Sequence, residues 1–359
     1  MTAPGSVHSD SLPDPSSPNG SAGPVQPDAD LVASLRAAGL LPAGEPGHFD
    51  ALTGGVSSDI WKVQTRERTF CVKRALSRLK VAAHWEAPLE RNRFEVAWYR
   101  IVHRIAPGSV PDIIHQDPEA MWFAMAYLDP ARFRLWKSVL REGEVNPDDA
   151  VQVGHRLALI HDLTASDESV RAQFPENGIF HAIRLAPYLE ATAQRHPDLQ
   201  DVLFALSRRT GRQRLAMIHG DVSPKNILLG PQGPVFLDAE CACLGDPAFD
   251  LAFCLNHLLL KCLWRPSARE ALLAGFDGLV QAYLAGVHWE AVDDLEQRAA
   301  TLLPGLLLAR VDGKSPVEYI EHDWQRAHVR TCARRLLRQP PTTLAAVRGA
   351  WHDELRTGS

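Results

Sequence analysis

The sequence predicts an α+β fold of two lobes, a small antiparallel-sheet lobe followed by a mostly helical one. Between residues 49 and 128, short segments rich in β-branched and aromatic residues alternate with turns and surround one amphipathic segment. After residue 128, apolar residues recur mostly at the three- and four-residue spacing of helices. The length of 359 residues fits two domains or one two-lobed unit.

The first lobe is expected to follow the order β-β-β-α-β-β after a short helix. Asp28 or Asp30 is placed to cap that helix, which ends at Gly39. The strands FDALTGG, DIWKVQT and TFCVKRA are joined through GGVSS and RER, and predict a three-stranded antiparallel start. Residues 88–105 carry apolar side chains at helical spacing. VPDIIHQ and AMWFAMAYL then complete the lobe as a strand pair.

The second lobe is predicted to be helical except in its middle. We expect helices at 148–163, 181–194, 198–208, 248–263, 267–285, 290–309 and 322–337. In the middle, AMIHGDVSPKNILLG and GPVFLDAE predict short aliphatic strands that flank polar loops. At the other end of the chain, residues 1–28 are rich in Pro, Ser, Gly and Asp, and predict a disordered tail.

Composition and charge argue against several classes of protein. Hydrophobic residues make up 45% and charged residues 23% of the chain, as in ordinary globular proteins. The net charge of -5 gives no basic excess, so we expect neither nucleic acid nor membrane as a partner. Six cysteines without a CxxC pair are typical of a reduced, cytoplasmic protein. The start MTAPGSVHSD does not resemble a signal peptide, and the apolar stretch 249–264 predicts a buried helix rather than a membrane span.

The segment IHGDVSPKNILL, residues 218–229, places His, Asp, Lys and Asn inside an aliphatic frame. It is either a polar turn between buried elements or the catalytic loop of a phosphoryl-transfer enzyme. Such enzymes position the nucleophile, hold the phosphates and bind Mg²⁺. In that role Asp221 accepts the proton of the substrate hydroxyl, Asn226 binds Mg²⁺ and His219 orders the loop. Asp238, which follows the apolar run VFL, is the second candidate Mg²⁺ ligand.

A turn that could cover phosphates lies in LTGGVSSDIWKV, residues 52–63. Gly54 and Gly55 allow close approach of the backbone, and Ser57 and Ser58 add hydroxyl donors. The alternative is an ordinary hairpin, because a Gly-Gly turn is common in proteins.

A lysine and a glutamate complete the set of groups that phosphoryl transfer needs. Lys73 lies in the apolar strand TFCVKRA, where it would contact the α- and β-phosphates; the alternative is a solvated lysine on an edge strand. Glu95 lies among core residues of the following helix, and a buried carboxylate needs a partner. We therefore favour Glu95 over Glu86 and Glu90 as the partner of Lys73.

The motif HGD-x₄-NILL, followed by FLDAE and GDPAFDLA, resembles the aminoglycoside phosphotransferase and choline kinase-like family of small-molecule kinases. The resemblance covers about residues 49–310. It implies a protein-kinase-like fold with ATP and Mg²⁺ as cofactors, and transfer of the γ-phosphate to a hydroxyl of a small molecule. It also implies a nucleotide-binding lobe over 29–128 and a helical lobe with catalytic loop and substrate site over 129–359.

For individual residues, the resemblance implies Asp221 as catalytic base, Asn226 and Asp238 as Mg²⁺ ligands, and Lys73 with Glu95 on the nucleotide side. It further implies that backbone groups near Ala126 and Leu128 form the hinge between the lobes and contact adenine. Asp250, and by the same argument Asp246, would brace the catalytic loop, and His161 would have no catalytic role.

The acceptor of the phosphoryl group stays open between an aminoglycoside, a methylthioribose-like sugar and an amino alcohol. The stretch LTGGVSSDIWKV suggests the methylthioribose kinase branch. We expect specificity to lie within residues 170–200 and 255–320, where Asp312 and Glu318 would suit a cation and Arg310 an anion. The alternatives in function are a protein kinase, disfavoured by Gly220 and the missing APE motif, and an inactive nucleotide-binding protein. The roles of Lys225, Glu240 and Arg310 and the oligomeric state also stay open.

Overall fold

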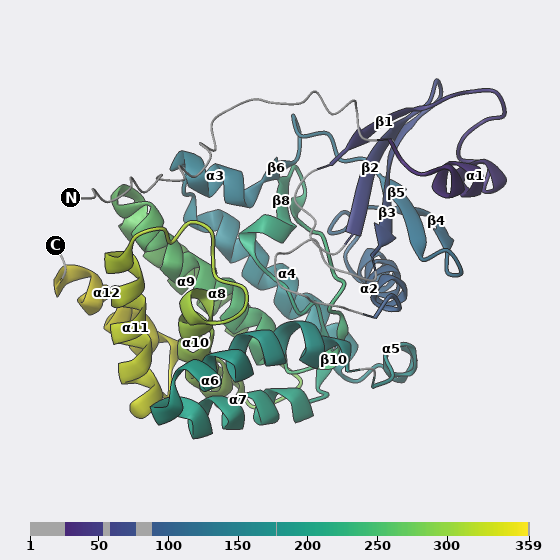
Figure 1. The fold of residues 1–359 in the computed structure, drawn as a ribbon. Coiled ribbons are helices and arrows are strands. Elements are labelled where there is room, and N and C mark those ends of the chain that lie inside the picture. Colours follow the sequence, from purple (N-terminus) through teal and green to yellow (C-terminus); the bar gives the residue numbers. More distant parts are fainter. Residues whose placement is uncertain (1–25, 53–57, 77–87, 177, 358–359) are drawn as a thin grey trace, which may run out of the picture.

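The computed structural model describes residues 26–52, 58–76, 88–176 and 178–357. Figure 1 shows a sheet with two helices beside it at one end of the molecule and a larger helical body at the other. This arrangement confirms the predicted α+β fold with a small antiparallel-sheet lobe and a helical lobe. The predicted tail, as far as residue 25, lies outside the described residues.

Five antiparallel strands form the sheet in the order β1-β2-β3-β5-β4. The strands are β1 (His48–Ala51), β2 (Ser58–Gln64), β3 (Thr69–Ala75), β4 (Ile113–Asp117) and β5 (Trp122–Ala126). The helix α1 (Ala29–Ala37) begins at Asp28, whose side chain accepts a hydrogen bond from the backbone N–H of Leu31 at 2.9 Å. Of the two candidate caps, Asp28 is therefore the one used.

The side chains of β3 alternate between the two faces of the sheet. Phe70 and Val72 pack with Leu31 of α1 in a small core on one face. Cys71 joins the main core on the other face, together with residues of α2 (Arg91–Ile105). Lys73 lies two residues after Cys71 and shares its face, so the strand directs this lysine toward α2.

The second lobe consists mainly of helices. They are α3 (Trp136–Glu142), α4 (Pro147–Ala165), α5 (Glu168–Gln173), the π-helix η1 (His181–Glu190), α6 (Ala191–Arg195), α7 (Gln200–Arg212), α8 (Pro247–Trp264), α9 (Arg269–Leu284), α10 (Val292–Asp312), α11 (Asp323–Arg338) and α12 (Leu344–Thr357). Short 3₁₀ turns cover Pro197–Leu199 (η2), Pro224–Asn226 (η3) and Pro266–Ala268 (η4). Every helix predicted in this lobe is present, with shifted ends.

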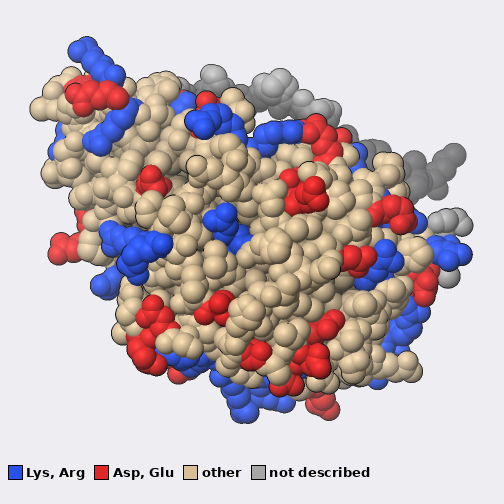
Figure 2. Space-filling view, turned by 180° about the vertical axis from the view of Figure 1, so that it is seen from behind, with Lys and Arg blue, Asp and Glu red and all other residues tan. Residues whose placement is uncertain are grey.

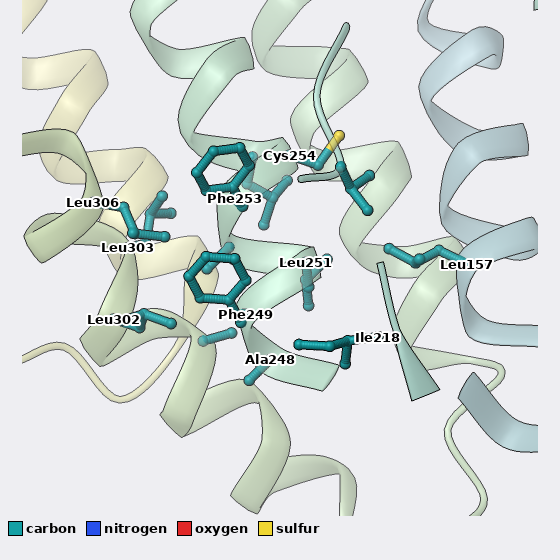
Figure 3. Packing of buried hydrophobic residues seen from close by; sticks show 14 of the residues in the cluster. Leu157, Ile218, Ala248, Phe249, Leu251, Phe253, Cys254, Leu302, Leu303 and Leu306 are labelled. Carbon is teal, nitrogen blue, oxygen red and sulfur yellow. The ribbon is translucent and has the colours of Figure 1, made fainter. Parts of the chain in front are cut away.

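Helix α8 runs through the centre of this lobe, and all of it except its last residue is buried. Figure 3 shows Phe249 and Phe253 of α8 beside Leu303 of α10, with Leu157 of α4 and Ile218 on the other side. The stretch 249–264 is thus the buried helix that the sequence predicts. In the described part of the chain, no helix has the length and apolar character needed to cross a membrane.

Short strands enclose the segment that carries the candidate catalytic residues. β7 (Ala216–Ile218) pairs with β10 (Cys243–Gly245), and β8 (Ile227–Gly230) lies between β6 (Arg134–Leu135) and β9 (Gly233–Phe236). The predicted aliphatic strands on either side of the polar loop are confirmed as β7, β8 and β9. Each strand is held by a partner, so both ends of the loop are fixed.

The largest difference from the predicted elements is in residues 181–194. An ordinary α-helix was the simplest interpretation of its spacing, but the structure has a π-helix over 181–190 with Pro187 inside it. Proline has no N–H to donate to the previous turn, and π-helical turns occur where the α-helical ladder is interrupted. The sequence did not predict α3 and α5, which have only seven and six residues, nor α12 with its 14 residues. On the face shown in Figure 2, described acidic and basic side chains are interspersed.

Candidate active site

The polar loop runs from His219 to Asn226, between the end of β7 and the start of β8. Gly220 has a φ of 76°, and a Cβ at this position would lie 2.7 Å from Cβ of Cys241. A glycine is therefore required both by the left-handed backbone and by the close approach of the neighbouring segment. This turn directs the following residue, Asp221, into the interior.

Asp221 is only 1% exposed, and its two carboxylate oxygens have different surroundings. Oδ2 accepts from Asn226 Nδ2 at 2.8 Å and pairs with Arg184 Nη2 at 2.7 Å and Lys225 Nζ at 3.1 Å. Oδ1 is buried and has no hydrogen-bond donor in the described part of the chain. Burial opposes ionisation of this carboxyl, but Arg184 and Lys225 outweigh it and hold the pKa of Asp221 below its usual value.

His219 and Asp250 fix the backbone of the loop. Asp250 accepts hydrogen bonds from the N–H of His219 at 2.7 Å and of Gly220 at 2.8 Å. The ring of His219 accepts from the N–H of Asp221 through Nδ1 (3.1 Å), so Nε2 donates to the carbonyl of Leu237 at 3.0 Å. Burial lowers the pKa of His219, which favours this neutral ring. The expectations that His219 orders the loop and that Asp250 braces it are confirmed as contacts.

The same expectation for Asp246 is wrong. Asp246 caps α8 by accepting from the N–H of Ala248 at 3.1 Å, and it pairs with Arg298. It therefore stabilises the start of α8 rather than the loop. His161 is fully buried, with Nδ1 2.7 Å from the hydroxyl of Tyr283 and Nε2 3.3 Å from Asp250.

Lys73 lies at the centre of a buried ionic group that joins the two lobes. Its Nζ is 2.8 Å from Glu95 Oε1 and also pairs with Asp238. The hydroxyl of Tyr99 donates to the same Glu95 oxygen at 3.1 Å and accepts from the N–H of Asp238 at 2.7 Å. The interpretation of Lys73 as a solvated edge lysine is wrong, because β3 is an inner strand and Lys73 is 2% exposed.

The charges in this group shift each other's pKa. Burial raises the pKa of Glu95 to about 7, although Lys73 acts in the opposite direction. Burial also opposes ionisation of Asp238, but Lys73 and Lys225 hold its pKa well below the usual range. Of the two carboxylates, Asp238 therefore stays ionised to lower pH than Glu95.

Asp238 and Asn226 lie side by side and offer oxygen ligands of the kind that Mg²⁺ prefers. The N–H of Leu237 donates to the carbonyl of Asn226 at 2.8 Å, which joins the two residues through the backbone. Asn226 uses its Nδ2 to bind Asp221, and its Oδ1 has no donor among the described residues. The described part of the chain contains no cluster of three or more His, Cys, Asp or Glu suited to a metal. Two protein oxygens fit Mg²⁺ that is also bound by phosphates and water.

The predicted nucleotide-side residues are only partly brought to this group. Gly54, Gly55 and Ser57 lie outside the described residues. Ser58 is buried at the start of β2, opposite Ala75 of β3.

Ala126 ends β5 at the edge of the sheet lobe, and its N–H already donates to the carbonyl of Asp112 at 2.9 Å. The N–H of Leu128, two residues later, has no acceptor within the described ranges. Of these two predicted hinge positions, Leu128 is the one with an N–H available to a ligand.

Two features of the site were not found from the sequence. Arg184, from the π-helix η1, donates to the carbonyl of Gly220 at 2.8 Å as well as pairing with Asp221. Its signal was a single arginine inside an apolar helical stretch, which requires a buried partner. The second is the ion pair between Arg91 at the start of α2 and Glu240, with 3.0 Å between Nε and Oε2. Glu240 therefore has a structural role, because this ion pair ties α2 to the segment after Asp238.

The structure thus brings together Asp221, the predicted base, Asn226 and Asp238, the predicted Mg²⁺ ligands, and Lys73, the lysine predicted to contact phosphates. A model of the phosphotransferase enzyme family (APH) matches residues 48–295, more than half of the chain. The chain belongs to this family. The matched region runs from β1 into α10 and contains Lys73, Glu95, Arg184, Asp221, Asn226 and Asp238, which confirms the resemblance seen in the sequence.

Curated relatives of this chain include methylthioribose kinases. The chain is 23% identical over 266 residues to methylthioribose kinase 2 of Oryza sativa subsp. japonica. The aligned region covers 65% of this chain and 62% of the relative. The chain is also 25% identical over 275 residues to methylthioribose kinase of Escherichia coli O45:K1 (strain S88 / ExPEC). Here the aligned region covers 66% of this chain and 64% of the relative. The chain therefore spans less than two thirds of the length of these relatives.

Among solved structures, amicoumacin kinase hAmiN in complex with AMP-PNP, Ca²⁺ and Ami has a TM-score of 0.53 and 13% sequence identity. The alignment covers 88% of this chain and 95% of that one. The two proteins share a fold along most of their length.

Proposed function

We propose that this phosphotransferase uses ATP and moves its γ-phosphate to a hydroxyl group of a small molecule. The observation that carries the proposal is the asymmetric carboxylate of Asp221. Three donors hold its Oδ2, whereas its buried Oδ1 has no donor in the described part of the chain. An oxygen in this state is available to accept the hydrogen bond, and then the proton, of an acceptor hydroxyl. The lowered pKa of Asp221 keeps it ionised at neutral pH.

The nucleotide side supports the same reaction. Glu95 holds Lys73 in a position to bind phosphate oxygens, and Asn226 with Asp238 would hold Mg²⁺. Bound Mg·ATP supplies the phosphoryl group and neutralises the charge that develops on it. The protein's own part is to place these ligands and to orient the acceptor hydroxyl against Asp221.

A protein kinase is the second candidate, and one observation disfavours it. Helix α8 begins at Pro247, so only a short stretch that contains β10 separates it from Asp238. This leaves no room for a long activation segment that phosphorylation could switch. An inactive nucleotide-binding protein is disfavoured because Lys73, Asp221, Asn226 and Asp238 are all in place.

The test is acceptor-dependent release of ADP by the full chain with Mg·ATP. The acceptors are methylthioribose, because curated relatives carry that name, and then an aminoglycoside and choline. We expect at least one small hydroxyl compound to stimulate ADP release, with phosphate found on that compound. Failure of every small acceptor, together with phosphorylation of a protein substrate, would favour the second candidate instead.

A further inference from the structure

A buried lysine in the helical lobe has no hydrogen-bond acceptor in the part of the chain that the structure describes, and the proposed mechanism does not use it. Lys261, near the end of α8, is 1% exposed, and its Nζ has no hydrogen-bond partner among the described residues. Its ammonium lies 4.3 Å from the ring centre of Trp264 and 4.1 Å from that of Tyr319. The two rings are stacked with centroids 4.9 Å apart. An ammonium buried only against aromatic rings lacks the acceptor that would offset its desolvation.

His257 lies one helical turn before Lys261, on the same side of α8. It is 4% exposed, its Nδ1 is 2.9 Å from the hydroxyl of Tyr319, and its Nε2 has no partner in the described part of the chain. Tyr319 thus touches both residues, which places an unpaired imidazole nitrogen and an unpaired ammonium around one phenol ring.

The surroundings of His257 and Lys261 carry an excess of positive charge. Burial and the charges of Arg310, Lys261, Lys225 and Lys137 all lower the pKa of His257 well below its usual value. Burial, Lys137 and Arg310 lower the pKa of Lys261 to about 7, against which only Glu318 acts. Glu318 is itself paired with Lys137. The negative group that acts on Lys261 is thus already shared with Lys137, and cations predominate among the described residues around the cluster.

This cluster is in electrostatic reach of the proposed reaction centre. Lys225, which contributes to the shift of His257, has its Nζ 3.1 Å from the carboxylate of Asp221. Arg310 donates to the hydroxyl of Tyr188 at 2.9 Å, and Arg184, the partner of Asp221, lies over the same ring at 5.9 Å. Lys225 and Tyr188 thus link these cations to the surroundings of Asp221.

We propose that the acceptor is a small hydroxy acid whose carboxylate binds Lys261 and His257 while its hydroxyl meets Asp221. The inference rests on the proposed phosphotransferase function and names its substrate class. A carboxylate has two oxygens, which suits the two nitrogen groups that have no partner among the described residues, and it adds negative charge where cations predominate. A cationic acceptor is disfavoured, because Lys261 already occupies the faces of Trp264 and Tyr319 where an ammonium group would bind. Arg310 and Tyr319 follow residue 295, where the family match ends, so the cluster includes residues outside that match.

The test compares acceptors that differ mainly in charge, using the full chain with Mg·ATP. The matched pairs are glycerate with glycerol and gluconate with glucitol, alongside methylthioribose and choline. We expect kcat/KM for an acid to exceed that for its neutral partner by roughly tenfold or more, since a charge-assisted hydrogen bond contributes on that order. Acids should also raise the melting temperature in the presence of Mg·AMP-PNP more than their neutral partners do.

Two variants separate ligand binding from a structural role of the lysine. Lys261→Met should abolish the preference for acids and the acid-induced melting shift, without lowering the melting temperature of the free protein, since it removes an unpaired buried charge. Lys314→Met, at an exposed position of the nearby loop, is the control and should keep the preference for acids and the acid-induced melting shift. Preference for methylthioribose, choline or a neutral alcohol would overturn the inference while leaving the proposed function intact. The inference would also be overturned if the Lys261→Met protein keeps the preference for acids. The same holds if it has a lower melting temperature and still shows the acid-induced melting shift. Absence of transfer to every acceptor would instead contradict the proposed function.

Discussion

Arg184 binds the catalytic loop at two points, with Nη2 2.7 Å from Asp221 Oδ2 and Nε 2.8 Å from the carbonyl of Gly220. Arg184 is 7% exposed, and the pKa of Asp221 is lowered despite its burial. In the proposed reaction, Arg184 therefore acts through Asp221, as a positioning residue that also keeps the proposed base ionised.

Replacing this arginine should impair the base without removing it. Arg184→Met removes the largest charge that lowers the pKa of Asp221, while burial continues to raise it. The acid limb of the kcat–pH profile should therefore move to higher pH. The loss of one charge-assisted contact costs about 2 kcal/mol, or roughly 30-fold in kcat near neutral pH. Arg195→Met, an exposed arginine after the same π-helix, is the control and should keep the profile of the wild type. If kcat falls by the same factor at every pH and the acid limb stays at its wild-type pH, Arg184 does not act by keeping Asp221 ionised.

The ionic group around Lys73 predicts a pH-dependent change in stability. Lys73→Met leaves buried Glu95 and nearby Asp238 without their shared cation, which should cost about 3–5 kcal/mol of the free energy of unfolding. The pKa of Glu95 is already raised to about 7, and loss of Lys73 raises it further. Glu95 is then protonated and neutral at lower pH, so the destabilisation should be smaller at about pH 6 than at about pH 8. Urea denaturation of both proteins at the two pH values measures this.

A double variant serves as the control for that experiment. Glu95→Gln combined with Lys73→Met removes both buried charges, so part of the lost stability should return. Destabilisation that is the same at both pH values, or no recovery in the double variant, would show that Glu95 is not the group that senses the loss.

The turn at Gly220 predicts a position that does not tolerate a side chain. Gly220→Ala should cost about 1–2 kcal/mol for the left-handed backbone and about 1–3 kcal/mol more for the contact with Cys241. Gly143 has a similar φ of 84° but nothing within 4 Å of a Cβ, so Gly143→Ala should show only the first cost. Chemical denaturation of both variants gives the difference. Equal losses would mean that the close approach to Cys241 does not constrain the loop.

The proposed role of Asp238 as a Mg²⁺ ligand predicts a change in the requirement for Mg²⁺ when this residue is replaced. EDTA should abolish phosphoryl transfer and added Mg²⁺ should restore it. Asp238→Asn should raise the Mg²⁺ concentration for half-maximal activity on the order of tenfold or more. Asp201→Asn, at an exposed carboxylate of α7, should leave the requirement unchanged. If the Asp238→Asn enzyme has the same Mg²⁺ dependence as the wild type, Asp238 is not a ligand of the metal.

The residues found from the sequence are those whose neighbours are set by local periodicity. Alternation along β3 places Lys73 on the face of α2, and the helical spacing of α2 places Glu95 among core residues, so their meeting was predictable. The loop between two short strands was predictable for the same reason. Arg184 was missed because its contact with Asp221 joins the π-helix to a loop 37 positions later in the sequence, and no local pattern specifies that pairing. Asp246 was assigned wrongly because two aspartates in GDPAFDLA fit the same description, and only the packing of α8 separates them.

Asp221 is the proposed base of the reaction, and Asp221→Asn tests this role most directly. The substitution retains the shape of the side chain but removes the proton acceptor. We expect kcat for transfer to the best acceptor to fall on the order of 10²- to 10⁴-fold, with phosphate followed on the acceptor. Binding of Mg·AMP-PNP should stay close to that of the wild type, because Lys73 and Asp238 are intact. A kcat within about twofold of the wild type would contradict the account, because general-base catalysis contributes far more than that.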